Sequence, residues 1–140
     1  MPLSPDALRT AVQTVLDVPL HRALDLQLLD PSDPVQGLAI TVGDLTANNV
    51  GVLHGGLAPL FLDVSAYLAV LPTLEPGTNA VTHTTTASLL RSVASGTRVR
   101  FRGTVDKRGR GLVFCSAHGL DEDDRLVATA QIVKSIVEVR

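Results

Sequence analysis

The sequence predicts an α+β fold in which a curved antiparallel sheet is wrapped around one long central helix. Two observations lead to this prediction. The segment from Gly56 to Leu71 is almost wholly apolar, and a helix that is apolar on all sides belongs in a protein interior. Four long strand-like segments then follow with only short turns between them, which is typical of antiparallel pairing. A sheet curved around the helix is the simplest way to bury it.

The elements can be assigned along a single domain, 1–140, because this length suits one core and is short for two. A capping serine and a proline precede an apolar set at helical spacing and predict an extra N-terminal helix in 1–18. Alternating leucines favour a strand between Leu20 and Leu29, and Gly37–Val42 reads as a second strand. The central helix is expected at 56–71.

The later part of the chain is predicted to be mostly strand. In one segment Arg98, Arg100 and Arg102 alternate with Val99 and Phe101, the pattern of a strand with one face in water. The four expected strands are Ala80–Leu90, Thr97–Asp106, Gly111–Leu120 and Arg125–Val137.

Composition excludes several classes of function. A net charge of -2 and a pI near 6.0 give no general attraction to nucleic acid or to an anionic membrane. The central apolar segment is short and contains an acid, so it does not predict a membrane span. The N-terminus does not have the pattern of a signal peptide. Cys115 is expected to be a core residue of a protein in the reducing cytoplasm. The four histidines have no metal-ligand spacing.

Asp63 is the leading candidate for a functional residue because it is the one acid in the apolar central helix. A buried carboxylate is costly unless it is paired, hydrogen-bonded or protonated. Gly55 and Gly56 mark the start of the helix, and Pro59 suits its first turn. Backbone N–H groups at a helix start have no intrahelical acceptor. The N–H of Gly55 is therefore a candidate donor to a carbonyl oxygen that develops negative charge; a simple tight turn is the alternative.

Eight residues separate Gly55 from Asp63, which is about 12 Å along a helix. This is too far for both to reach one reacting carbon within the same chain. If two copies of the helix run antiparallel across a dimer interface, Gly55 of one copy faces Asp63 of the other. The spacing therefore leads to a hypothesis of two equivalent sites shared between chains.

Other polar residues have ordinary structural interpretations. Asn48 and His54 precede the helix and are expected in a turn. The Lys107–Gly111 segment is expected to be a solvated hairpin turn, with capture of a ligand phosphate as the weaker alternative. One strand carries a row of hydroxyl side chains, of which one is a candidate to point at the site. These residues are Thr82, Thr84, Thr86 and Ser88.

The segment from Asn48 through Gly51 and His54-Gly55-Gly56 to Asp63 resembles the motif of PaaI-like hotdog-fold acyl-CoA thioesterases. The match agrees in residue type and spacing at each motif position, and the resemblance extends from about Gly37 to Val137. Ser92-Val93 departs from the Arg-Pro that many relatives have at a turn. The resemblance implies a hotdog fold, an obligatory homodimer and, commonly, a homotetramer made of two dimers.

The resemblance also implies roles for residues at matching positions. The backbone N–H of Gly55 would polarise the thioester carbonyl, and His54 and Asn48 would hold that region or the water. Asp63 from the other chain would be the general base or the nucleophile, and Thr82 would bind the water. The sequence leaves the choice between the two roles of Asp63 open.

The activity expected from this resemblance is hydrolysis of acyl-CoA, with no resident cofactor because CoA arrives as part of the substrate. Gly56 would lie against the substrate, and Arg108 and Arg110 are candidates to contact its phosphates. One alternative is a non-catalytic acyl-CoA-binding hotdog protein. A hydratase is a second, but Asp63 lacks the closely following histidine of that class. Composition does not choose between aliphatic and aromatic acyl groups.

Overall fold

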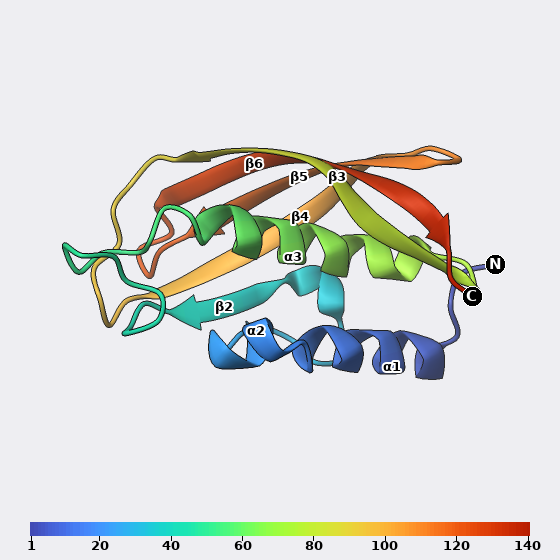
Figure 1. Ribbon diagram of the computed structural model, residues 1–140, viewed down its shortest axis with the longest axis horizontal. Helices are drawn as coiled ribbons and strands as arrows, with labels where there is room; N and C mark the ends of the chain where they lie inside the picture. Colours follow the sequence, from blue (N-terminus) through green and yellow to red (C-terminus); the bar gives the residue numbers. More distant parts are fainter.

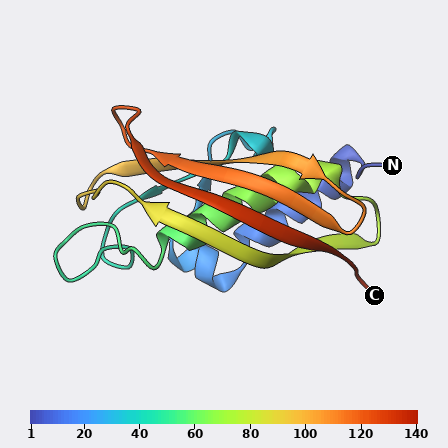
Figure 2. The same ribbon diagram turned by 90° about the horizontal axis from the view of Figure 1, so that it is seen from above.

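The computed structural model describes residues 1–140 and has a six-stranded antiparallel sheet curved around helix α3 (Figures 1 and 2). The strand order is β1-β2-β4-β5-β6-β3, so β3 forms one edge of the sheet. The helices are α1 (Pro5–Leu16), α2 (Pro19–Ala23) and α3 (Ala58–Val70), with 3-10 turns η1 (Pro34–Gln36) and η2 (Leu71–Thr73). The strands are β1 (Gln27–Leu28), β2 (Leu38–Thr41), β3 (Thr78–Leu89), β4 (Arg98–Arg108), β5 (Leu112–Leu120) and β6 (Leu126–Glu138). The predicted fold class is therefore confirmed.

Helix α3 is buried on nearly all sides, as its composition predicts. It begins at Ala58 with Pro59 in its first turn and ends at Val70, where η2 continues. Phe61 and Phe101 of β4 are fully buried, and their ring centroids lie 5.3 Å apart. Although α3 is apolar, it has 13 residues, and no helix of the chain is both long and apolar enough to cross a membrane.

Gly103 of β4 allows the closest approach between the sheet and α3. A Cβ atom at this position would lie 2.4 Å from the Cα of Ala66 and 2.5 Å from the carbonyl oxygen of Ser65. Because both are helix backbone atoms, any side chain at 103 would push α3 away from the sheet. Gly103 therefore sets how deeply α3 sits in the sheet.

Strand β4 has the alternation that its sequence predicts. Val99 and Phe101 are fully buried, whereas Arg98 and Arg102 are exposed and Arg100 is partly exposed. One face of β4 thus packs on the core and the other faces water.

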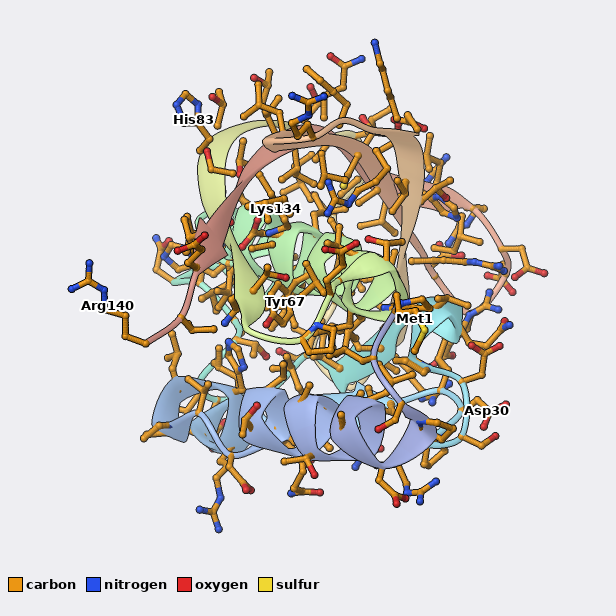
Figure 3. The ribbon with its side chains drawn as sticks, turned by 90° about the vertical axis from the view of Figure 1, so that its right-hand side faces the viewer. Met1, Asp30, Tyr67, His83, Lys134 and Arg140 are labelled. Carbon is orange, nitrogen blue, oxygen red and sulfur yellow. The ribbon has the colours of Figure 1, made fainter.

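The N-terminal helix lies on the side of α3 that faces away from the centre of the sheet (Figures 1 and 3). Ser4 caps α1, since its Oγ accepts a hydrogen bond of 3.2 Å from the N–H of Ala7. Val12 and Val15 are the buried residues of α1 and join the core. This helix therefore covers a face that the sheet does not reach.

The strand expected between Leu20 and Leu29 is wrong over most of its length. Pro19 begins the short helix α2, and only Gln27 and Leu28 pair with β2. Asp25 has a positive φ of 54° and turns the chain between the two elements. The alternation of leucines therefore reflects a helix, a turn and a short strand rather than one continuous strand.

The turn between β5 and β6 is organised by a nearly buried acid, Asp121. Its Oδ1 accepts hydrogen bonds from the N–H groups of Asp123 and Arg125, and its Oδ2 accepts one from Nε of Arg125, all at 2.9 Å. These bonds, led by the one from the Arg125 N–H, hold the pKa of Asp121 below its ordinary value. The acid thus closes its own turn.

Candidate active site

Asp63 lies in the middle of α3 and faces strands β3 and β6. Its Oδ1 accepts a hydrogen bond of 2.6 Å from the hydroxyl of Thr82 and one of 2.8 Å from Nζ of Lys134. Its Oδ2 accepts no hydrogen bond within the chain, and the side chain is 26% exposed. The acid in the apolar helix is therefore paired and still accessible.

Lys134 is the partner that reasoning from the sequence missed. It lies on β6 and is 1% exposed, and Figure 3 shows it on the concave side of the sheet. Its Nζ also donates a hydrogen bond of 2.9 Å to Thr82, and it lies 5.6 Å from the ring centroid of Tyr67. The sequence contains a signal for this residue. Lys134 is the one charged residue in an inward-facing row of β6 that also contains Ala130 and Ile132.

A β-bulge in β3 places Thr82 opposite Lys134. The register shifts between Thr82 and Thr84, so that Thr82 pairs with Lys134 and Thr85 pairs with Ile132. Paired residues share a face of the sheet, so Thr82 and Thr85 face inward and Thr84 faces outward. The predicted single row of hydroxyls is therefore wrong, because the extra residue of a bulge reverses the alternation.

The residues that precede α3 form a tight, locally bonded loop. Oδ1 of Asn48 accepts hydrogen bonds from the N–H groups of Val50 and Val52, at 3.0 and 3.2 Å. Nδ1 of His54 accepts one of 3.0 Å from the N–H of Gly56. The N–H of Gly55 donates to no acceptor in the chain. Asn48 and His54 therefore shape the loop and leave the Gly55 N–H unpaired at the exposed start of the helix.

The chain does not bring all of the predicted site residues together. Gly55 has no hydrogen bond with Asp63, and a Cβ atom at Gly55 would lie 3.7 Å from the side chain of Leu89, at the end of β3. Arg108, at the end of β4, and Arg110, in the β4–β5 turn, are both exposed. This turn lies at the opposite end of the molecule from the start of α3 (Figure 1). Within one chain, Gly55 is therefore separate from the hydrogen-bonded cluster around Asp63.

A cavity of about 430 Å³ opens beside Asp63, between α3 and the N-terminal helices. Thr82 and Lys134 also line it, and its opposite wall comes from α1, α2 and the segment joining them. At its side the hydroxyl of Tyr67 donates a hydrogen bond of 2.6 Å to Oδ1 of Asn79. Burial raises the pKa of the Tyr67 hydroxyl, so this group is protonated at neutral pH. The remaining lining residues are Thr14, Val15, Val18, His21, Leu60, Val64 and Ala80.

Other reactive groups do not form a competing site. Cys115 is buried, and burial raises the pKa of its thiol, which makes the nucleophilic thiolate less available. No group of three or more His, Cys, Asp or Glu side chains gathers in a way that could hold a metal ion. The reactive arrangement in the chain is therefore the one around Asp63.

Comparison with known proteins gives the family of the chain. The family model described as the thioesterase superfamily matches residues 50–128. A thioesterase from Haemophilus influenzae is 21% identical, with 99% of this chain and 93% of that chain covered and a TM-score of 0.79. A phenylacetic acid degradation-related protein from Ralstonia eutropha is 25% identical, with 91% and 98% covered and a TM-score of 0.75.

A third similar structure is a Bacillus halodurans protein solved with CoA, which is 18% identical, with 94% of this chain and 84% of that chain covered and a TM-score of 0.79. A search of curated proteins gave no match. The matched range contains His54, Gly55, Asp63 and Thr82 and ends before Lys134. The family match and the fold agree with the resemblance found in the sequence: the chain belongs to the thioesterase superfamily and has the hotdog fold.

Proposed function

We propose that the protein hydrolyses acyl-CoA thioesters to a free acid and CoA. The observation that carries this proposal is the carboxylate of Asp63, which lines a cavity, is partly exposed and keeps Oδ2 free of hydrogen bonds within the chain. A carboxylate with one oxygen fixed and the other free is suited to accept a proton from water or to attack a carbonyl carbon.

Asp63 can promote hydrolysis by two routes. In the first, a water oxygen bonds to the carbonyl carbon, its proton passes to Asp63, and the carbon–sulfur bond breaks. In the second, Asp63 attacks the carbon and water hydrolyses the resulting acyl-enzyme anhydride. In each route CoA leaves as a thiolate, which needs little help from an acid. The reaction therefore requires no resident metal or organic cofactor.

The second half of the proposed site is the N–H of Gly55 from another copy of the chain. This N–H is unpaired and exposed, so it is available to a carbonyl oxygen that gains negative charge in the transition state. Strand β3 supports the pairing of two copies, because its 12 residues form an edge of the sheet and expose Val81 and Leu89. Two β3 strands paired about a two-fold axis would bring two α3 helices side by side and antiparallel.

The similarity to a structure that contains CoA supports a CoA thioester as substrate. We assign Gly56 to the passage of the pantetheine chain, because it has no side chain to obstruct a substrate. Arg108 and Arg110 are exposed and are the basic residues that we assign to the phosphates of CoA. In a two-fold dimer they would serve the half-site of the neighbouring chain, since the β4–β5 turn and the start of α3 lie at opposite ends of one chain (Figure 1).

We further propose that the working unit is at least a homodimer, with a homotetramer of two dimers as the expected form in solution. Light scattering coupled to gel filtration measures this directly, and a fully active monomer contradicts the shared site. The single unpaired Cys115 fits a cytoplasmic protein, since thiols are kept reduced there.

Thiol release from a panel of acyl-CoAs tests the activity and identifies the acyl group. The panel varies chain length and aromaticity, and a thiol-reactive dye reports free CoA. We expect turnover by the wild type and a fall in kcat of about a hundredfold or more for Asp63→Ala. Light scattering on the same sample checks that the dimer is intact. Wild-type turnover by Asp63→Ala would overturn the role of Asp63.

The alternative of a non-catalytic acyl-CoA-binding protein gives a different result in the same experiment. A binding protein would be stabilised against heat by an acyl-CoA but would release no thiol beyond the uncatalysed rate. Thermal stabilisation without turnover across the panel would therefore replace the proposed hydrolase with this alternative.

A further inference from the structure

We propose that Lys134 is a positioning residue that, together with Thr82, fixes the carboxylate of Asp63 in its reactive orientation. This inference rests on the proposed function and assigns a role to a residue outside the range that the family model matches, 50–128. Lys134 acts through Asp63, because its side chain is 1% exposed and its Nζ donates hydrogen bonds to Asp63 and Thr82.

Three contacts form a closed triangle among three elements of the fold. Nζ of Lys134 lies 2.8 Å from Oδ1 of Asp63 and 2.9 Å from Oγ1 of Thr82, and that hydroxyl lies 2.6 Å from the same Oδ1. Both donors therefore converge on one oxygen of Asp63, and Oδ2 is the oxygen left for chemistry. Two hydrogen bonds to Oδ1 restrict rotation of the carboxylate, which otherwise exchanges its two oxygens.

The triangle also fixes the hydrogen of the Thr82 hydroxyl. A threonine hydroxyl has one hydrogen to donate, and Thr82 uses it on Asp63 while it accepts a hydrogen bond from Lys134. In this arrangement Thr82 is left with a lone pair and can meet a water only as an acceptor. Lys134 therefore helps to fix the direction of the hydrogen bonds at Thr82 as well as the position of the Asp63 carboxylate.

A merely structural role does not explain a lysine at this position. The inward row of β6 is otherwise apolar around it, with Ala130 and Ile132 buried, and an apolar side chain of similar volume would complete that row. Replacement of a buried ion pair by packed apolar residues is often neutral or stabilising. The cost of burying the Lys134 ammonium is offset only by its contacts with Asp63, Thr82 and the ring of Tyr67.

Lys134→Met tests the proposal because methionine keeps the approximate length of the side chain and removes its charge. We expect kcat to fall by about a hundredfold, the scale of a misplaced reacting group, while KM stays within about threefold of the wild type. The matched control is Ile132→Met, a volume-conserving change in the same buried row, which is expected to leave both constants unchanged. Wild-type kcat for Lys134→Met overturns the proposal.

A double-substitution cycle separates positioning from a general loss of structure. If Lys134 acts through Asp63, adding Lys134→Met to Asp63→Ala lowers the residual kcat no further, because groups that act as a unit are not additive. A further fall in the double variant that matches the fall in the wild-type background contradicts the proposal. If Lys134→Met does not fold, Lys134→Leu carries the same test, since leucine also removes both the charge and the hydrogen-bond donor.

The outcomes also separate this proposal from the proposed function. Turnover by the wild type with an inactive Asp63→Ala and a fully active Lys134→Met overturns only the role of Lys134. No turnover by the wild type on any acyl-CoA of the panel overturns both, because no reaction would then remain for Asp63 to perform.

Discussion

Asp63 and Asp121 each have a basic partner, but their surroundings differ in a way that fits a functional role for Asp63 and a structural role for Asp121. Asp121 receives three hydrogen bonds on its two oxygens, all from residues two to four positions further along the chain. Asp63 receives two on a single oxygen, from Thr82 and Lys134, which are 19 and 71 residues away. Asp121 has local partners on both oxygens and closes a turn, whereas the distant partners and the free Oδ2 of Asp63 fit the reactive role that we propose for it.

The largest expected effect tests whether Asp63 serves another chain. Asp63→Ala and Gly55→Pro, which removes the backbone N–H, are each expected to lower kcat by about a hundredfold. A mixed dimer of the two variants contains one site with both groups intact. After subunit exchange, random pairing is expected to restore about a quarter of the wild-type activity. Activity is measured as thiol release from an acyl-CoA.

The control for this experiment mixes Asp63→Ala with a chain that carries both substitutions, which produces no intact site. Mass spectrometry under native conditions verifies that the mixed dimers form. If verified mixed dimers show no recovery of thiol-release activity, Asp63 and Gly55 do not meet across an interface. The shared site proposed for Asp63 would then be wrong.

A smaller effect is expected at Asp121. Asp121→Asn removes the charge and the ion pair with Arg125, so we expect the midpoint of thermal unfolding to fall by a few degrees while kcat is unchanged. Differential scanning calorimetry and the thiol-release assay measure the two quantities on one sample. A loss of kcat with an unchanged midpoint would reverse the assignment of structural and functional acids.

The smallest expected effect is on how the difference in unfolding midpoint between the wild type and Asp121→Asn depends on pH. The pKa of Asp121 is lower in the folded chain than its ordinary value, so its ionised form stabilises the fold above the ordinary aspartate pKa of about 3.9. This contribution is lost as the pH falls through the lowered, folded-state pKa. The gap in unfolding midpoint between wild type and Asp121→Asn should therefore narrow in acid. A gap that stays constant down to the acid range would contradict a role for the charge of Asp121.

The parts of the fold that the sequence predicts are those that one segment determines by itself. The apolar stretch around Asp63 predicts a buried helix because no other environment suits it, and the alternation around Phe101 predicts a half-buried strand. The prediction between Leu20 and Leu29 fails because a helix start at Pro19 and a left-handed Asp25 divide a pattern that looks continuous.

Spacing along the chain relates candidate site residues only where they are close in the sequence, and Thr82 is assigned its role through the family resemblance. Asp63 lies in α3 and Gly55 lies just before it, so the distance between them along the helix can be estimated from their spacing in the sequence. The pairing of Asp63 with Lys134 depends on the register between β3 and β6, and that register includes a bulge after Thr82. One inserted residue reverses which side chains face the core, and no local pattern marks where the insertion falls.

The cavity beside Asp63 has two walls, which come from different parts of the fold. One wall carries Asp63 and Lys134 on a helix and a sheet that Gly103 holds at a fixed distance. The other consists of α1 and α2, joined where Nδ1 of His21 donates a hydrogen bond of 2.7 Å to the carbonyl of Val15. If the cavity holds the acyl group of the proposed substrate, changes in the second wall can reshape its space while the carboxylate stays in place. Under the proposed function, the substrate range can therefore change through residues of α1 and α2, without any change at Asp63 or Lys134.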